Sequence, residues 1–282
     1  MNLGKTGILI FAYNRPSHLK RVLIAIESLN ITSKIILIID GAKNVADKIN
    51  QKSMVLMANR FKKKNFKVLC RKKNLGLSKS ITSGIDTFAK KFEGLIILED
   101  DVVPYKSFFF FIKKTFKSYS KKKDVIAICG YQNKNFNLYN EKILKPILLS
   151  NFTPWGWAIS SKKWMQSKKL MKKTNFKFLD SIPDFFKKYL NKNYQKKKGK
   201  NLWSLKFIYE NYKGKKKYIY PNFSLVKNIG FDGTGVNSKA TNIFDVKDKN
   251  PKKILNLKKL TIDKKLIKKH NTFFKKNIKY FY

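Results

Sequence analysis

The sequence predicts an α/β fold in which a mostly parallel, doubly wound sheet carries helices on both faces. Strand-like segments alternate along the chain with segments that repeat apolar residues at helical spacing, as in successive βαβ units. The strand-like segments are apolar at almost every position, which is typical of parallel strands covered on both sides. With 43% hydrophobic residues in 282, the chain is long and apolar enough to bury a substantial core.

Strands and helices alternate regularly up to about residue 130. The first expected strand, Thr6–Tyr13, leads into a helix that begins at Pro16 and repeats apolar residues from Leu19 to Leu29 at helical spacing. The other strands expected in this half are Lys34–Ile39, Phe66–Cys70, 94–98 and Val125–Cys129, and helices are expected near 47–63, 79–92 and 108–119. Right-handed crossovers would bring the carboxyl ends of these strands to one edge of the sheet.

The pattern becomes less regular from residue 131. The expected features are an aromatic turn within Asn151–Ser160, helices at Asp180–Tyr189 and Trp203–Tyr212, strand-like runs at Lys217–Tyr220 and Pro221–Ile229, and a glycine-rich loop at 230–235. Beyond Asn237 the chain is basic, with weak helical signals near 252–270. We expect residues 238–282 to form a basic tail on the domain or on a membrane surface.

The charge of the chain is strongly positive, with 63 Lys+Arg against 17 Asp+Glu and a formal net charge of +46. Such a balance suggests nucleic acid, an anionic membrane surface or acidic ligands as partners. The lysines, however, are spread over nearly every surface segment and form no distinct stripe. A generally lysine-coated, solvated surface is therefore favoured over a specific site for nucleic acid, and a basic polyanion-binding module stays the alternative.

Cysteine use and hydropathy indicate the compartment. Cys70 and Cys129 each lie in an apolar strand-like run, so we expect two small core residues and neither a disulfide nor a metal pair. The first residues lack the pattern of a secretory signal, and Phe108–Ile112 is too short to span a bilayer. We expect a cytoplasmic protein, with peripheral contact at the inner face of the membrane through anionic lipid headgroups.

Three adjacent carboxylates, Glu99, Asp100 and Asp101, follow directly on the apolar strand at 94–98. Three anions at the end of a buried strand cannot all stay charged without a cation. A divalent ion that holds a diphosphate would supply it, because Mg2+ and Mn2+ prefer carboxylate and phosphate oxygens. Taken alone, an acidic turn before the next helix is the commoner explanation of such a triplet.

Three other strand ends should meet the acidic one at the same edge, where open α/β sheets bind ligands. Tyr13-Asn14-Arg15 forms a tight strand-to-helix turn, which brings a guanidinium and a helix N-terminus to a place suited to phosphate. Asp40 ends the second strand, and a basic loop with Gly76-Leu77-Ser78 follows the third. Each feature alone has an ordinary structural explanation, but together they describe a nucleoside diphosphate site.

The sequence resembles the GT-A fold glycosyltransferases that use nucleotide-sugar donors. The motifs FAYNRP, IID, NLGLS and ILEDD occur in the order found in that family. The closer likeness is to bacterial family-two-type sugar transferases of polysaccharide loci, and the more distant one to the N-acetylglucosaminyltransferase that begins complex N-glycans. These proteins share a GW turn, which reads TPWGWA here, and an ending of the pattern P..SLV.NIGFDG.G, which reads PNFSLVKNIGFDGTG here. The resemblance covers roughly residues 6–237.

Carried over residue by residue, the resemblance implies that Asp101 of the DXD-like motif ligates the metal and that Asp40 contacts the nucleobase. Glu99 and Asp100 would hold the ribose, the donor sugar or metal-bound waters. The other residues implied in nucleotide-sugar binding are Tyr13, Asn14, Arg15, Gly76, Leu77 and Ser78. Trp155-Gly156-Trp157 would form a platform for a sugar face, since such faces stack on aromatic rings, and core packing of the two tryptophans is the alternative.

Two departures from the family concern the chemistry. Relatives often place a histidine after the last glycine of the closing loop, where this chain has Val236-Asn237-Ser238, and the distant relatives place a catalytic aspartate where a helix here begins at Trp203. An inverting transferase needs a base for the acceptor hydroxyl. The candidates in this chain are Asp184, Glu210 and Asp232, with Asp180 weaker. An inactive transferase homologue is thus an alternative; a nucleotidyltransferase is disfavoured, because Asn14-Arg15-Pro16 lacks the expected glycine.

The resemblance implies a GT-A domain at residues 1–237, with a nucleotide-binding half at 1–130 and an acceptor half at 131–237. The implied activity is a hexosyl- or N-acetylhexosaminyl-transferase. With Mn2+ or Mg2+, it would move a sugar from a nucleoside-diphosphate sugar to a hydroxyl of a glycan or lipid-linked acceptor. Among such donors, a UDP-sugar is the first expectation. Inversion at the anomeric carbon and a place in surface polysaccharide or glycoconjugate synthesis are expected in the same way.

Overall fold

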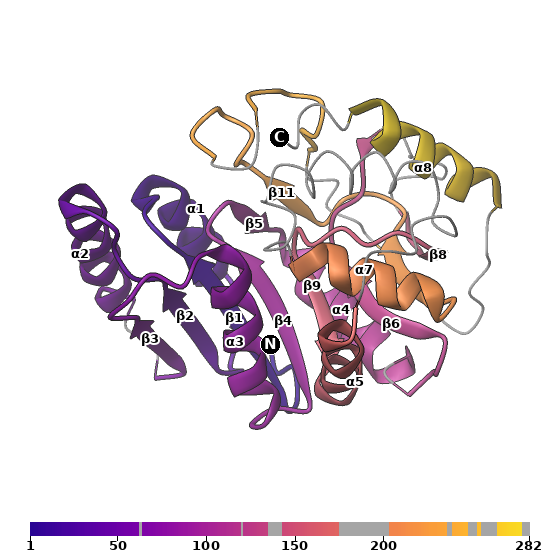
Figure 1. Cartoon of the computed structure of the whole chain (residues 1–282), viewed down its shortest axis with the longest axis horizontal. Helices are drawn as coiled ribbons and strands as arrows, with labels where there is room; N and C mark the ends of the chain where they lie inside the picture. The colour runs from indigo at the N-terminus through magenta and orange to yellow at the C-terminus, as the bar shows by residue number, and fades with distance from the viewer. Residues whose placement is uncertain are drawn as a thin grey trace.

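A mixed sheet of eight strands runs through the molecule (Figure 1). The computed structural model describes residues 1–61, 64–119, 121–134, 143–174, 203–235, 239–247, 253–254 and 264–277. The strand order is β3-β2-β1-β4-β9-β6-β10-β8. Their bounds are β1 Thr6–Ala12, β2 Ile35–Ile39, β3 Phe66–Cys70, β4 Gly94–Glu99, β6 Val125–Cys129, β8 Pro146–Leu149, β9 Trp157–Ser160 and β10 Lys217–Pro221.

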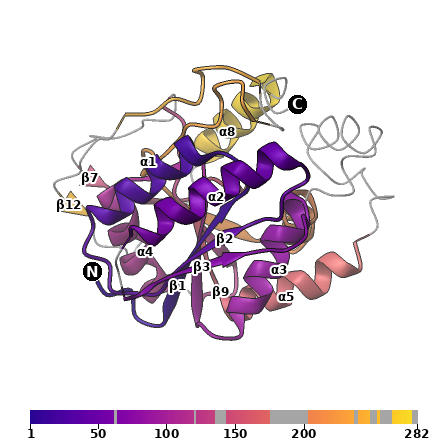
Figure 2. The same ribbon diagram turned by 90° about the vertical axis from the view of Figure 1, so that its left-hand side faces the viewer.

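Helices cover both faces of this sheet, as predicted (Figure 2). Their bounds are α1 Pro16–Glu27, α2 Val45–Asn59, α3 Leu77–Ala89, α4 Lys106–Tyr119, α5 Ser161–Lys172, α7 Trp203–Lys213 and α8 Lys264–Asn277. Buried side chains of α1, α2 and α4 form one hydrophobic cluster with one face, and those of α3, α5 and α7 form a second cluster with the other face. The predicted doubly wound α/β fold is therefore confirmed.

Strand β1 shows why the parallel strands are apolar at almost every position of the sequence. Its neighbours β2 and β4 pair with it in parallel. Ile8 and Ile10 enter the cluster under α1, whereas Leu9 and Phe11 enter the cluster under α3. Because successive side chains of a strand point to opposite faces, a strand that is covered on both faces is apolar throughout.

The second half of the chain completes the same sheet. Strand β9 lies between β4 and β6 and is antiparallel to both. Strand β10 pairs in parallel with β6 and antiparallel with β8. The aromatic segment expected to form a turn therefore ends in a central strand. The two halves share one sheet, and their division into nucleotide and acceptor functions stays a prediction.

One of the two cysteines lies at the edge of the sheet and is not buried as predicted. Strand β3 is the last strand on its side, and Cys70 at its end is exposed. The prediction that Cys70 is a core residue is wrong, because an edge strand is covered less than a central one. Cys129 in β6 is fully buried as predicted, and burial raises the pKa of its thiol to about 12.

A second, two-stranded sheet lies beside the first and joins distant parts of the chain. Strand β11, Val226–Asn228, pairs antiparallel with β5, Val102–Pro104. This pairing brings the glycine-rich loop after β11 next to the acidic turn, which is formed by residues 99–101 just before β5. The remaining pair of short strands is β7, Ile143–Leu144, with β12, Lys253–Ile254.

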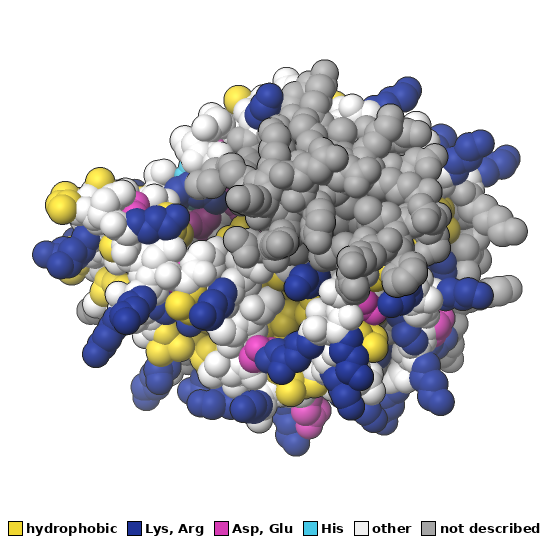
Figure 3. All heavy atoms as spheres, viewed as in Figure 1, with side chains coloured by type: hydrophobic (Ala, Val, Ile, Leu, Met, Phe, Trp, Pro, Cys, Tyr) yellow, Lys and Arg dark blue, Asp and Glu magenta, His cyan; other side chains and the backbone are white. Residues whose placement is uncertain are grey.

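The segments after residue 238 that the structure describes contact the core. The hydroxyl of Tyr131 donates to the carbonyl of Phe244 at 3.0 Å, and Leu266 of α8 is buried in the cluster on the α3 side. Within the described ranges, α8 included, no helix has the length and apolar character needed to cross a bilayer. Figure 3 shows Lys and Arg side chains spread over the visible face and not gathered into one stripe.

Candidate functional site

The acidic turn lies at the end of β4 and faces the turn between β1 and α1. Phe11 of β1 stands opposite Glu99 of β4 in the parallel register, so the residues that follow each strand meet. Nη2 of Arg15 lies 2.6 Å from Oδ1 of Asp100 and 2.7 Å from Oδ2 of Asp101. The cation that the sequence required for this cluster is therefore supplied, at least in part, by the chain itself.

The protonation of this cluster follows from burial and mutual charge. Burial, reinforced by Asp101 and Asp100, raises the pKa of Glu99, which favours the protonated form of this carboxyl. Burial also raises the pKa of Asp100 to about 6, against the effect of Arg15. For Arg15, burial opposes the charged form, but Asp101 and Asp100 outweigh it and raise the pKa. Arg15 thus stays charged here, whereas the pKa of Glu99 is shifted in favour of its neutral form.

The two aspartates differ in what they can still bind. Asp100 uses Oδ1 for Arg15 and Oδ2 for the backbone N–H of Tyr13 at 3.3 Å, and 7% of its side chain is exposed. Asp101 gives Oδ2 to Arg15, and 17% of its side chain is exposed. Asp100 therefore holds the β1–α1 turn in place, whereas Asp101 is the better placed of the two to take a further ligand.

The glycine-rich loop closes over Asp101. The N–H of Ile229 donates to the carbonyl of Asp101 at 2.8 Å, and the N–H of Gly230 donates to Oδ1 of Asn228 at 2.8 Å. A Cβ atom at position 230 would overlap Oδ2 of Asp101 and lie 2.9 Å from its Cγ. Glycine is required here by this close approach, which explains the glycine in the NIGFDG motif.

A second contact, which the sequence did not indicate, ties this loop to α1. Nε2 of His18, in the first turn of α1, lies 3.0 Å from Oδ2 of Asp232. Burial of Asp232 works against its charged form, but hydrogen bonds from the N–H and hydroxyl of Thr234 lower its pKa. The start of α1 thus contacts both the acidic turn, through Arg15, and the loop at 230–235, through His18.

Tyr13 and Asn14 are held by Asp47, another residue that the sequence did not single out. The hydroxyl of Tyr13 and the side-chain amide of Asn14, at 2.7 Å, both donate to the carboxylate of Asp47 near the start of α2. These hydrogen bonds lower the pKa of Asp47, while burial and Asp47 raise the pKa of Tyr13. The predicted turn is therefore fixed at both ends, by Asp47 and by Asp100.

Asp40 lies at the expected edge and organises the loop that leads to α3. Its carboxylate accepts the N–H groups of Leu75 at 3.0 Å and Gly76 at 2.9 Å, and the side chain is buried. Gly76 has φ +74° and is the N-cap of α3, in whose first turn Leu77 and Ser78 lie. Asp40 thus positions this loop, and its contact with a nucleobase stays a prediction.

The aromatic turn does not have the role expected of it as a whole. Trp157 is 0% exposed and stacks on Trp203, with ring centroids 5.5 Å apart and 21° between the planes. Trp155 is also buried and packs edge-on against Tyr131 at 4.6 Å. Gly156, with φ +68°, accepts the N–H of Gly130 at 2.6 Å. The prediction that Trp157 offers a face to a sugar is wrong, because its side chain is wholly buried in the hydrophobic core.

Trp157→Ala separates core packing from sugar binding. We expect the variant to lower the free energy of unfolding by about 3–5 kcal/mol, the usual cost of deleting a large buried aromatic side chain. Urea unfolding would measure this change. Leu170→Ala on α5, where the side chain is 47% exposed, is the matched control and should cost less than about 0.5 kcal/mol. Native-like stability of Trp157→Ala would contradict the packing role.

The three candidate bases have different surroundings. Glu210 on α7 accepts a hydrogen bond from Thr174 at 2.9 Å and pairs with Lys213 at 3.3 Å. In the described part of the chain, no hydrogen bond or ion pair joins Glu210 to the acidic turn. Asp184, Asp180 and the segment 236–238 lie outside the described residues. Asp232 is the candidate whose loop contacts the acidic turn.

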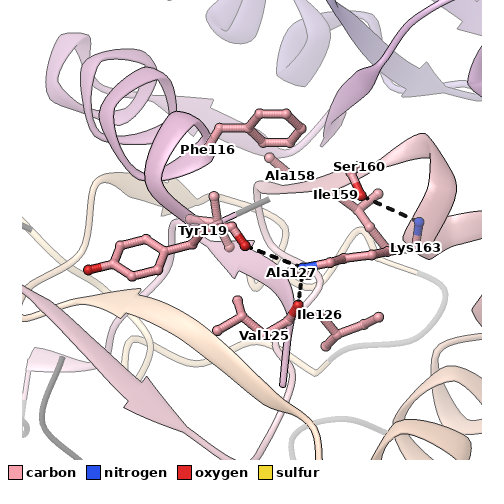
Figure 4. Close-up of a pocket in the computed structure, with 10 residues that line it drawn as sticks. Phe116, Tyr119, Val125, Ile126, Ala127, Ala158, Ile159, Ser160 and Lys163 are labelled. Carbon is pink, nitrogen blue, oxygen red and sulfur yellow. Dashed lines mark hydrogen bonds between the residues drawn. The ribbon is translucent and has the colours of Figure 1, made fainter. Parts of the chain in front are cut away.

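A small pocket lies away from the acidic turn, between α4, β6 and the junction of β9 with α5 (Figure 4). Nζ of Lys163 donates to the carbonyls of Val125 and, at 3.3 Å, of Tyr119. Val125 begins β6, which runs parallel to β4 because both are antiparallel to β9. This pocket is therefore at the opposite edge of the sheet from Asp101, and its lysine serves the backbone.

Comparisons with known proteins find likeness only among solved structures. No family model matches the chain, and a search of curated proteins finds no match. The mannosyltransferase PcManGT from Pyrobaculum calidifontis, in complex with GDP-Man and Mn2+, is similar with 11% identity and a TM-score of 0.40, over 64% of this chain and 47% of that one. GalNAc-T7, with UDP, GalNAc and Mn2+, is similar with 11% identity and a TM-score of 0.47, over 77% and 42%.

A third similar structure is glucosyl-3-phosphoglycerate synthase from Mycobacterium tuberculosis, with 9% identity and a TM-score of 0.35, over 56% of this chain and 57% of that one. This chain thus spans about half the length of these solved chains. All three are GT-A glycosyltransferases, the class whose motifs the sequence resembles. At such identities and scores the likeness concerns the fold and says nothing of activity.

Proposed function

We propose that this protein is a metal-dependent glycosyltransferase that moves a sugar from a nucleoside-diphosphate sugar to an acceptor hydroxyl, with inversion. The observation that carries the proposal is the meeting of Arg15, Asp101 and Gly230 at the carboxyl edge of β4. A cation, a carboxylate with an exposed part and a closely approaching backbone loop are the elements that a diphosphate site needs.

The chain's own residues divide the work of binding. The nucleoside would lie along the turn of Tyr13 and Asn14 and the loop that Asp40 holds, because these elements border the acidic turn on the β1 and β2 side. The start of α1 and the guanidinium of Arg15 would face the diphosphate, since helix N-termini and Arg both favour phosphate. Glu99 and Asp100 would border the ribose or the donor sugar.

A divalent cation at this site would have few protein ligands. Within the ranges that the structure describes, no three His, Cys, Asp or Glu side chains cluster in a way that could hold a metal. Asp101 would therefore be one protein ligand of an ion, Mn2+ or Mg2+, that phosphate oxygens otherwise hold. When bound, the ion would neutralise charge that develops on the departing diphosphate.

The acceptor side is proposed from fewer contacts. Asp232 would take the proton from the acceptor hydroxyl, because its loop adjoins Asp101 and 43% of its side chain is exposed. We further propose a glycan or lipid-linked acceptor in surface polysaccharide synthesis. Peripheral contact with an anionic membrane would rest on the lysine-rich surface, whose net charge of +46 favours anionic headgroups.

A panel of nucleotide sugars with Mn2+ tests this function by the melting temperature. A donor present at 100 times its Kd adds about 2.7 kcal/mol to the stability, which should raise Tm by roughly 5–10 °C. We expect one class of UDP- or GDP-sugar to give this rise only together with Mn2+. An equal rise with any polyanion, without metal and abolished by salt, would support the polyanion-binding alternative instead. Binding without donor hydrolysis or transfer would indicate an inactive homologue.

A further inference from the structure

One atom of Arg15 lies where a bridging cation would lie in the acidic turn. Its Nη2 contacts one oxygen of each aspartate, at 2.6 Å to Asp100 and 2.7 Å to Asp101, and 21% of the Arg15 side chain is exposed. A guanidinium and a divalent ion cannot share Oδ2 of Asp101 without mutual repulsion in this partly buried place. The two cations are therefore expected to compete.

Contacts other than Arg15 position the two aspartates. The other oxygen of Asp100 accepts the N–H of Tyr13, the backbone carbonyl of Asp101 accepts the N–H of Ile229, and Gly230 lies close to the Asp101 side chain. Arg15 is the N-cap of α1, and its carbonyl accepts the N–H of Leu19 at 3.1 Å. Its backbone is thus anchored, but its long side chain can change partner by rotation about its own bonds.

We propose that Arg15 is an exchangeable counter-ion, which keeps a divalent cation off Asp101 until a nucleoside diphosphate binds. This rests on the proposed function, because the exchange needs a diphosphate to receive the guanidinium. The planar fork of Arg fits carboxylate and phosphate equally well. When the diphosphate draws Arg15 away, Oδ2 of Asp101 is released to the metal. Metal and nucleotide then bind cooperatively, each raising the affinity for the other.

The two possible roles of Arg15, competitor of the metal or structural support, predict opposite changes in Mn2+ affinity when the arginine is removed. If Arg15 only stabilised the acidic turn, its removal would loosen Asp101 and weaken metal binding. If Arg15 competes with the metal, its removal strengthens metal binding in the absence of nucleotide. The sign of the change in Mn2+ affinity therefore separates the two roles.

The test is a titration of the full chain with Mn2+ alone, followed by electron paramagnetic resonance of the free ion. We expect Arg15→Gln to bind Mn2+ at least tenfold more tightly than the unchanged protein. Arg21→Gln, which removes an exposed arginine from the same helix, is the matched control for net charge and should change the Kd less than twofold. An unchanged or weaker Mn2+ affinity of Arg15→Gln would overturn the proposal.

The same titration with UDP or GDP present completes the test. These nucleotides should tighten Mn2+ binding to the unchanged protein by more than they tighten it in Arg15→Gln, because the variant has no competitor to displace. If Arg15→Gln does not fold, Arg15→Lys serves. Because the lysine side chain is shorter, its ammonium does not reach the place of Nη2 between the two aspartates. Mn2+ alone should therefore bind more tightly than to the unchanged protein, and equal or weaker binding would overturn the proposal.

These measurements also separate this proposal from the proposed function. Tighter Mn2+ binding by Arg15→Gln with no response to either nucleotide would support the competition at Asp101. It would contradict the proposal that the protein uses a nucleotide-sugar donor. Nucleotide binding with no gain in Mn2+ affinity in Arg15→Gln would be consistent with the transferase function but would contradict the exchange of Arg15 for the metal.

Discussion

Asp101→Asn is expected to lower metal-dependent turnover of the donor by about three orders of magnitude. The amide keeps the size of the side chain but removes the charge that would hold the metal, and a loss of about 4 kcal/mol in transition-state stabilisation corresponds to this factor. Steady-state turnover in Mn2+ with the donor selected by the melting-temperature panel would measure it. The fold should persist, because Arg15 keeps its contact with Asp100.

The control for this variant is Asp124→Asn. Asp124 is an exposed carboxylate just before β6, at the edge of the sheet opposite the acidic turn. Its loss lowers the acidic charge by the same amount without touching the site, so turnover should stay within twofold. Full activity of Asp101→Asn at saturating Mn2+ would contradict the assignment of Asp101 as the metal ligand, whatever the role of Arg15.

The site could be predicted from sequence where it depends on the order of the strands. Parallel strands joined by right-handed crossovers bring their carboxyl ends together, and for this reason the sequence predicts Arg15, Asp40 and Asp101 at one edge. The contact of Arg15 with both aspartates follows from the adjacency of β1 and β4. What the strand order did not reveal is that the arginine would itself take the place of the expected cation.

Other features could not be predicted because their partners are remote in sequence or supplied by the tertiary fold. Asp47 resembles an ordinary acidic residue at a helix start, and only the fold brings it to Tyr13 and Asn14, 34 and 33 residues away. His18 meets Asp232 through the pairing of β11 with β5. Cys70 has the same apolar neighbours as a core cysteine, since the exposure of a strand depends on its place in the sheet.

The aromatic turn shows how a motif can be recognised while its role is misjudged. Trp157 lies in a turn that resembles one in sugar transferases, yet its four-residue strand β9 is inserted at the centre of the sheet. A strand of this length has too few residues to show an alternating pattern. Its burial therefore became evident only from the antiparallel pairing with β4 and β6.

Gly230→Ala is expected to lower turnover by about two orders of magnitude, although it adds only one methyl group. The added Cβ would overlap Oδ2 of Asp101 and lie 2.9 Å from its Cγ, so either the carboxylate or the loop at 230–235 must move. A shift of about 1 Å in a reacting group commonly costs this much in rate. Turnover and Mn2+ affinity, measured together in the presence of nucleotide, should both fall.

Gly214→Ala is the matched control, because the nearest atoms to its added Cβ lie 3.5 Å away and its backbone needs no positive φ. It should leave turnover within twofold. The comparison also reports on the neighbouring contact, since a displaced loop carries Asp232 away from His18. If Gly230→Ala kept full turnover and unchanged Mn2+ affinity, the loop would not define the position of Asp101, and the closeness of the two would be a feature of packing alone.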